Sequence, residues 1–304
     1  MKNYTANGKL LLTGEYLVLK GALALAVPTK LGQTLTVETV HAPSLQWDAY
    51  KPDGPWFSAT LSPDHLDVID TDDSSKALKL SRILTVVREL NPSVFKPGLR
   101  FETHLGFKPE WGLGSSSTLI SNLAQWAEIN PYQLLKKTVG GSGYDVACAT
   151  ASTPIFYRLD NEMPQIIPVA FDPPFAERLF FVYQGKKQHS SDEVKGFARR
   201  MQEYDPQADI EAVSEISRTL PEVITLADFR ECLDRHEAIL GHCLDRQPVK
   251  QQFPDFEGSL KSLGAWGGDF LLAATEWPFE KVKEYFYSKG LDTIFKYQEL
   301  YGSK

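Results

Sequence analysis

Residues 108–124 read KPEWGLGSSSTLISNLA, a glycine-rich turn followed by three serines and an apolar pattern. The pattern predicts a helix, because Ile120, Leu123, Ala124 and Ala127 recur at i, i+3, i+4 and i+7. A helix start presents unpaired N–H groups and a positive dipole end, and glycines let the backbone approach an anion closely. The stretch therefore predicts a phosphate-binding loop, although glycine and serine before a helix are also ordinary capping residues. It is not a Walker A loop, since no G-x-x-x-x-G-K-[ST] motif occurs.

Three other stretches place glycines beside charged residues. GKLLLTGEYLVL at 8–19 predicts a strand, a turn and a second apolar segment. GGSGYDVA at 140–147 puts the Asp145 carboxylate after a flexible glycine turn. KSLGAWGGDF at 261–270 is a second glycine-rich loop that leads into an apolar run. Phosphate binding thus has support from more than one place in the chain.

The composition limits the classes of protein. The chain has 304 residues, 42% of them hydrophobic and 23% charged, which favours a globular protein of two domains. A net charge of −7 argues against general nucleic-acid binding, which needs a basic surface. Three cysteines without C-x-x-C spacing favour reduced thiols, and Glu15 and Lys20 interrupt the apolar residues 10–27. We therefore expect a soluble, cytoplasmic protein with no nucleic-acid or membrane partner.

Hydrophobic periodicity predicts alternating strands and helices, which is typical of an α+β fold. The proline-rich residues 164–174 are expected to separate two domains, and residues 41–75 are expected to hold short strands and exposed loops. The other predicted strands are 9–12, 16–19, 23–27, 34–40, 99–104, 155–157, 179–183, 270–274 and 292–298. Besides the helix after the serines, the predicted helices are 76–90, 192–204, 207–219, 226–244 and 278–288.

In order and spacing, the four glycine-containing stretches resemble motifs of the GHMP kinases, the superfamily of galactokinase, homoserine, mevalonate and phosphomevalonate kinases. The resemblance spans nearly the whole chain. It implies a two-domain α+β fold, with an ATP-binding N-terminal domain at 1–165 like part of ribosomal protein S5 (its domain 2) and a ferredoxin-like C-terminal domain at 166–304. It further implies ATP and Mg²⁺ as cofactors and an active site in the cleft between the domains.

Asp145 is the first candidate for catalysis. A kinase that acts on an alcohol must orient the hydroxyl and accept its proton, and a carboxylate on a glycine turn can do both. The alternative is an aspartate that stabilises its own turn. Lys9 is the second candidate, because a lysine near a carboxylate lowers its pKa and stabilises charge on the attacking oxygen. The resemblance assigns both residues to the catalytic site, whereas a solvated lysine is the default without it.

The resemblance also assigns the nucleotide site to the loop at residues 112–117. Ser116 is implied as the Mg²⁺ ligand, and Ser115 and Ser117 as donors to phosphate. Mevalonate kinases place an acidic metal ligand about eleven residues before the catalytic aspartate, but Leu134 stands there in this chain. The complete set of residues implied for the nucleotide is Gly112, Leu113, Gly114, Ser115, Ser116 and Ser117.

Two short motifs favour the phosphomevalonate kinases within this superfamily. Gly14-Glu15-Tyr16 resembles their G-E-Y, and residues 141–145, GSGYD, resemble their G-S-G-F-D. Residues 184–192, QGKKQHSSD, resemble their T-G-K-x-x-S-T segment, where lysines and hydroxyls at a helix start suit a phosphorylated substrate. A basic loop with a helix cap is the alternative. The residues expected to bind the acceptor are Glu15, Lys186, Lys187, Ser190, Ser191, Gly264, Ala265, Trp266 and Gly267.

Trp266 departs from the family pattern, because a glycine is usual at its position. Its indole could stack on a substrate or pack in the interior. The sequence thus favours a GHMP-class kinase for a small alcohol or phosphorylated alcohol, with phosphomevalonate first, which implies the mevalonate pathway of isoprenoid biosynthesis. Mevalonate, a sugar or another small alcohol stays open as the acceptor, as does an inactive binding protein with this fold. A homodimer also stays open.

Overall fold

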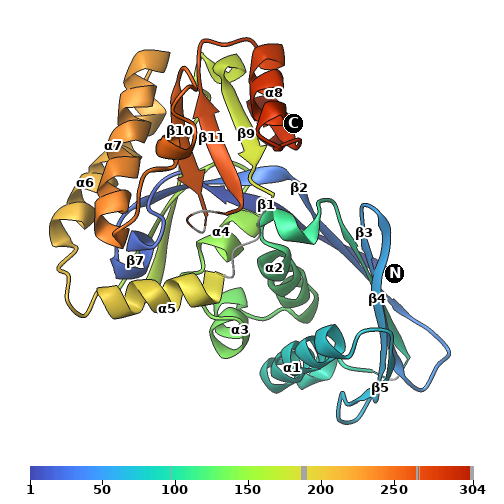
Figure 1. The fold of residues 1–304 in the computed structure, drawn as a ribbon. Coiled ribbons are helices and arrows are strands. Elements are labelled where there is room, and N and C mark those ends of the chain that lie inside the picture. The colour runs from blue at the N-terminus through green and yellow to red at the C-terminus, as the bar shows by residue number, and fades with distance from the viewer. Residues whose placement is uncertain (97, 186–189, 265, 267, 302–304) are drawn as a thin grey trace. The chain divides into compact units, whose positions relative to one another are not determined.

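The structure, a computed structural model, describes residues 1–96, 98–185, 190–264, 266 and 268–301, and only the backbone of residues 190–192. The chain divides into two compact units. Figure 1 labels most of their helices and strands. The first unit contains Met1–Gly8, Leu31–Pro109 and Leu113–Thr150. The second unit contains Lys9–Lys30, Glu110–Gly112 and Ala151–Lys304.

The larger sheet has the strand order β5-β4-β3-β6-β2-β7-β8, and β1 also pairs with β2. Strands β3 and β6 are parallel, and the other neighbours with a described register are antiparallel. The long strand β2 passes from the second unit into the first. The strands are β1 (Lys2–Leu11), β2 (Ala24–Thr39), β3 (Leu45–Lys51), β4 (Gly54–Leu61), β5 (Val68–Thr71), β6 (Leu99–Leu105), β7 (Ile155–Asp160) and β8 (Met163–Pro168).

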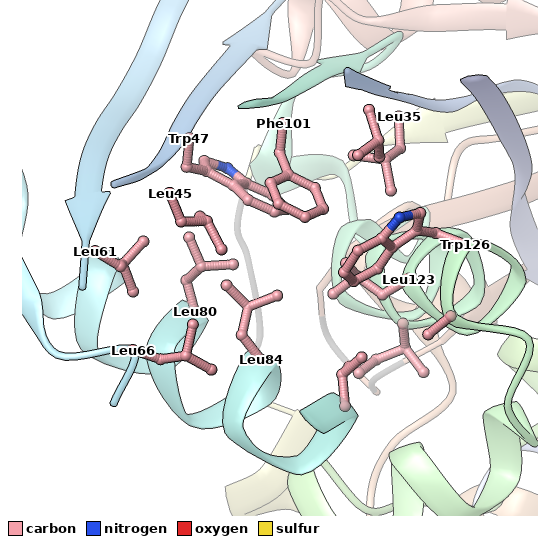
Figure 2. Packing of buried hydrophobic residues seen from close by; sticks show 14 of the residues in the cluster. Leu35, Leu45, Trp47, Leu61, Leu66, Leu80, Leu84, Phe101, Leu123 and Trp126 are labelled. Carbon is pink, nitrogen blue, oxygen red and sulfur yellow. The ribbon is translucent and has the colours of Figure 1, made fainter. Parts of the chain in front are cut away.

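The core of the first unit lies between its strands and three helices, α1 (Ser74–Leu90), α2 (Ser115–Ala127) and α3 (Pro131–Thr138). Alternate residues of β3 and β6 point inward, so that Trp47 and Phe101 stack with ring centroids 5.3 Å apart. Trp126 of α2 meets Phe101 edge-on, and Leu80 and Leu84 of α1 complete the cluster (Figure 2). Each such buried side chain contributes about 1.5–3 kcal/mol by leaving water. This core fixes α2, which carries the serines.

The second unit contains an antiparallel sheet of order β10-β11-β9-β12. Every residue of β9, β10 and β11 is buried, which is typical of strands covered on both faces. Its strands are β9 (Leu179–Tyr183), β10 (Ser259–Leu263), β11 (Phe270–Ala274) and β12 (Ile294–Lys296). Its helices are α5 (Ser190–Arg200), α6 (Gln207–Thr219), α7 (Leu226–Leu244), α8 (Phe279–Ser288) and α9 (Tyr297–Leu300); α4 (Tyr144–Thr150) belongs to the first unit.

Most predicted elements are present, but several differ from the prediction. The strand expected at 292–298 is shorter, because β12 ends at Lys296 and the next residues form α9. The expected strand at 16–19 is a 3-10 helix at Leu17–Lys20, flanked by left-handed glycines. The strands expected at 23–27 and 34–40 are one strand, β2. Strand β10 occupies part of the stretch interpreted as a loop. The expected domain boundary after residue 165 falls inside β8. Within the described parts of the chain, no helix combines the length and apolarity needed to cross a bilayer.

Candidate functional site

A glycine turn leads the chain into α2. Gly112 and Gly114 have φ values of 69° and 93°, in the left-handed region that glycine adopts without strain. Gly114 is the N-cap residue, and its carbonyl accepts a hydrogen bond from Thr118 N–H at 2.9 Å. The amides before Thr118 have no acceptor inside the helix, and a glycine N-cap offers them no side chain. The start of α2 is therefore able to receive an anion.

The three serines at this helix start differ in exposure. Ser116 is exposed and Ser115 is half-buried. Ser117 is buried, and its hydroxyl donates to the Gly114 carbonyl at 2.8 Å. Because a hydroxyl carries one proton, Ser117 uses its proton to stabilise the turn. Of the two serines predicted to donate to phosphate, Ser115 is therefore the one whose hydroxyl proton is not used in the turn contact of Ser117. Ser116, the predicted metal ligand, is exposed beside it.

Helix α2 is anchored to β2 by polar contacts in the interior. Thr118 donates through Oγ1 to Gln33 Oε1 at 2.9 Å, and Asn122 donates through Nδ2 to the Gln33 carbonyl at 3.0 Å. All three residues are buried. Removal of one partner from such a contact costs about 1–3 kcal/mol, because the other is left buried without its bond. The serines thus stand on a rigid support.

Asp145 lies in the first turn of α4, directly after glycines with left-handed backbones at 140, 141 and 143. Its Oδ1 accepts from Val146 N–H at 3.1 Å. Helix α4 packs against α2 in the first unit, so the two helix starts that were predicted to carry chemistry belong to one packed pair. Asp145 is half-buried.

The position of the family's acidic metal ligand is apolar here. Leu134 is fully buried in α3, within the core of the first unit. Among the residues that the structure describes, no cluster of three or more histidine, cysteine, aspartate or glutamate side chains could hold a metal. An exposed serine hydroxyl at a helix start still fits Mg²⁺, because this ion keeps water and phosphate oxygens as most of its ligands. Ser116 meets that description.

Lys9 and Glu15 belong to the second unit. Lys9 is a half-buried residue of β1. The Glu15 carboxylate is buried and forms an ion pair with Lys261, whose Nζ also donates to the Ser262 carbonyl at 2.9 Å. Burial raises the pKa of Glu15, while the charges of Lys261 and, more weakly, Lys9 oppose that rise. The Glu15 carboxylate faces Lys261 in this structure, and its predicted contact with the acceptor stays a prediction.

Two residues of α7 extend this buried cluster. His236 Nε2 accepts from Gly14 N–H at 3.0 Å, which requires a neutral ring with the proton on Nδ1. Burial and the nearby Lys261 charge lower the His236 pKa well below its ordinary value, in agreement with that assignment. Glu237 accepts from Ser262 N–H at 3.2 Å and from Val249 N–H at 3.1 Å. Burial raises the pKa of Glu237 to about 7.

The C-terminal glycine-rich loop begins at Gly264, which follows β10 with a φ of 78°. Trp266 is buried among apolar side chains, and its predicted contact with the acceptor stays a prediction. The Asp269 carboxylate lies against both Gly264 and Gly112, so that a Cβ at either glycine would collide with it. The loop thus closes on the glycine that precedes the serines. Gly112, Gly264 and Asp269 all belong to the second unit.

Comparison with solved structures finds the same fold in several known kinases. Mevalonate kinase from Methanococcus jannaschii superposes with a TM-score of 0.70 at 15% identity, over 97% of this chain and 96% of that one. Streptococcus pneumoniae phosphomevalonate kinase, in complex with phosphomevalonate and AMPPNP, gives 0.71 at 16% identity, over 97% and 100%. Lactococcus lactis galactokinase, complexed with galactose, gives 0.64 at 13%, over 97% and 92%.

The chain has the fold of the GHMP kinases. The predicted fold class is confirmed, and the solved structures that share the fold include kinases of the superfamily whose motifs the sequence resembles. Neither a family model nor a curated protein matches the sequence itself. At 13–18% identity, the structural likeness extends to the fold and not to the substrate.

Several residues predicted for the acceptor site of this GHMP fold lie outside the described residues. These are Lys186, Lys187, Ala265 and Gly267. Ser190 and Ser191 begin α5, and their side chains are likewise not described. Their predicted roles stay predictions.

Sequence reasoning missed the buried polar residues that support the motifs. His236 and Glu237 lie between Leu233 and Leu240 at the i, i+3, i+4, i+7 spacing of the buried face of α7. Ionisable side chains on the buried face of a helix need polar partners, so this spacing could have predicted a buried polar cluster. Lys261 had no comparable signal, because a short buried strand lacks a polar face.

Proposed function

We propose that the chain is an ATP-dependent kinase of the GHMP class that phosphorylates a small alcohol. One observation carries the proposal: α2 starts with open amides and the exposed Ser116, and α4, packed against it, starts with Asp145. Open amides at a helix start favour phosphate, and a carboxylate on the neighbouring helix is what an alcohol needs to lose its proton. The GHMP fold supports the same activity.

Each residue then has a defined task. The triphosphate of ATP binds along residues 112–117, where the glycine backbone admits it closely. Ser116 would hold Mg²⁺, which when bound would supply positive charge to the transferred phosphoryl group. Asp145 orients the acceptor hydroxyl and accepts its proton, and Lys9 stabilises negative charge on the attacking oxygen. Because Leu134 stands where mevalonate kinases have an acidic metal ligand, Ser116 is the protein ligand proposed for Mg²⁺.

The preferred acceptor is phosphomevalonate, a step in the synthesis of isoprenoid precursors. The sequence G-E-Y at residues 14–16, the G-S-G-Y-D at 141–145 and the lysines Lys186 and Lys187 support it. The similarity to the S. pneumoniae phosphomevalonate kinase is consistent with it. Mevalonate or a sugar is the alternative within the class. The buried Leu134 favours a second function, a binding protein with this fold and no transferase activity.

The test is phosphoryl transfer from MgATP to a panel of phosphomevalonate, mevalonate and galactose, followed by ³¹P NMR of the products. We expect a diphosphate product and ADP with phosphomevalonate. Efficient turnover of mevalonate alone would contradict the preferred acceptor but keep the kinase class. ATP binding without transfer to any acceptor would instead support the binding-protein alternative.

The lysines provide a second test. Replacing both Lys186 and Lys187 with alanine should raise the KM for phosphomevalonate roughly ten- to hundredfold, because a charge-assisted contact contributes about 1.5–3 kcal/mol. The KM for ATP should change little. Lys2→Ala/Lys79→Ala removes the same charge from exposed positions and should leave both values unchanged. An unchanged KM for phosphomevalonate in the first variant would exclude these lysines from the acceptor site.

A further inference from the structure

Trp266 is held at three points within the second unit. Its indole belongs to an apolar cluster with Tyr16, Phe197 and Leu240, and only 7% of the residue is exposed. Its backbone N–H donates to Tyr16 Oη at 2.8 Å, and its carbonyl accepts from Arg246 Nη1 at 3.3 Å. A glycine at this position could keep the two backbone contacts but none of the packing. The tryptophan therefore adds a restraint that the usual glycine lacks.

The contacts of Trp266 continue to α5. Arg246 forms an ion pair with Glu193 at 2.8 Å, and Tyr16 packs against Phe197 with ring centroids 5.6 Å apart. Glu193 and Phe197 are four residues apart, so they lie on one face of α5. The first half of α5 is thus connected to Trp266 by a polar contact through Arg246 and by an apolar contact through the shared cluster.

The other end of α5 has a separate anchor. Arg200 donates through Nη2 to the His242 carbonyl at 3.2 Å, and through Nε to the Cys243 carbonyl. These acceptors lie in the last turn of α7, where the negative end of the helix dipole attracts a cation. The Trp266 contacts therefore act on the N-terminal half of α5, which is the half that follows the lysines proposed for the acceptor.

Tyr16 is held in an unusual backbone conformation to make its contact. Its φ is 60°, which is uncommon outside glycine and strains the backbone. Burial raises the pKa of Tyr16, so the hydroxyl stays protonated and its oxygen accepts from Trp266. The neighbouring ion pair of Glu15 with Lys261 fixes the same turn. The fold thus stabilises a strained turn that places this hydroxyl at the C-terminal loop.

We propose that Tyr16, Trp266 and Arg246 are positioning residues that couple the C-terminal glycine-rich loop to the N-terminal half of α5, and thereby set the affinity for the phosphoryl acceptor. The inference rests on the proposed kinase function for its effect on the acceptor. The coupling itself is a property of the second unit and is measured without substrate.

The first experiment measures hydrogen exchange of the α5 amides in the whole protein. Trp266→Gly should accelerate exchange in residues 193–197 at least tenfold, with a smaller change near Arg200. Tyr16→Phe, which loses only the acceptor oxygen, should give a smaller acceleration in the same residues. Trp277→Gly is the matched control, because Trp277 is 8% exposed and belongs to a different apolar cluster. Equal exchange of residues 193–197 in the Trp266 and Trp277 variants would overturn the coupling, whether or not the protein is a kinase.

The second experiment separates positioning from general stability by steady-state kinetics with phosphomevalonate and ATP. Trp266→Gly should raise the KM for the acceptor at least tenfold and change that for ATP less than threefold, and Trp266→Phe should restore most of the acceptor affinity. Trp277→Gly lowers only the amount of folded enzyme, so kcat falls and neither KM moves. An unchanged acceptor KM in Trp266→Gly would overturn the positioning role. If the wild-type chain phosphorylates no acceptor, the proposed function fails, and the exchange measurement still decides the coupling.

Discussion

Removal of the Lys261 charge gives a quantitative test of the buried cluster behind the N-terminal motif. Lys261 is fully buried and Glu15 is 2% exposed, so neither charge can be solvated when its partner is lost. Lys261→Met keeps most of the aliphatic side chain and leaves the buried Glu15 carboxylate without its lysine partner. Breaking a buried pair in this way costs about 3–5 kcal/mol, which is a large part of the 5–15 kcal/mol of a typical domain.

The loss should grow with pH. Burial already raises the pKa of Glu15 above 4.5, and without Lys261 the largest opposing influence is gone. A raised carboxyl pKa gives stability that is present below the unfolded pKa and is lost as the pH rises toward the folded one. The slope is about 1.4 kcal/mol per pH unit for one proton. From pH 5 to pH 7, Lys261→Met should therefore lose up to about 2.7 kcal/mol more than the wild type.

The measurement is urea unfolding followed by tryptophan fluorescence at pH 5, 6 and 7. The control is Glu15→Gln/Lys261→Met, which removes both charges and should recover most of the stability and the extra pH dependence. A loss below 1 kcal/mol for Lys261→Met would refute the reasoning. So would a double variant less stable than the single one, because the cost is assigned to an unpaired Glu15 charge and not to lost packing.

Three further predictions concern the candidate site. Asp145→Asn should fold with unchanged melting temperature and lose phosphoryl transfer by ~10²–10⁴-fold, and near-normal turnover would remove this residue from the mechanism. Gly112→Ala should weaken nucleotide binding measured by calorimetry, because the added Cβ would collide with Asp269. The control is Gly140→Ala, since Gly140 has a similar positive φ but no atom near the position of an added Cβ. Equal effects of the two variants would assign the loss to backbone strain alone. Glu237, with a pKa of about 7, contributes stability below pH 4.5 that is lost as the pH rises through 7. Glu237→Gln should flatten that slope by up to about 1.4 kcal/mol per pH unit, and parallel curves would contradict the assignment.

Sequence patterns predicted the elements whose side chains show a clear period. Helix α7 at Leu226–Leu244 and strands β9 and β11 have the predicted bounds. The segment Leu17–Lys20 was misassigned because a short apolar run has the same appearance in a buried strand and in a buried helical turn. Strand β10 was missed because Lys261 stands at its centre, and a charge there is tolerated only through its pairing with Glu15, which is distant in sequence.

In the predicted site, a residue that matches a family motif need not have the role that the motif suggests. The G-E-Y turn suggested a substrate-binding segment. Each of its residues instead forms a polar contact with a different part of the second unit. Gly14 N–H donates to a histidine of α7, the Glu15 carboxylate faces the lysine of β10, and Tyr16 Oη accepts from the C-terminal loop. Sequence spacing places these residues near the chemistry but carries no information on whether a carboxylate is buried or open. Pairing with Lys261 in the interior offsets the cost of burying the Glu15 carboxylate. The turn therefore joins elements of the second unit, and we expect contacts with substrate at residues that the fold leaves more accessible, such as Ser116 and Asp145.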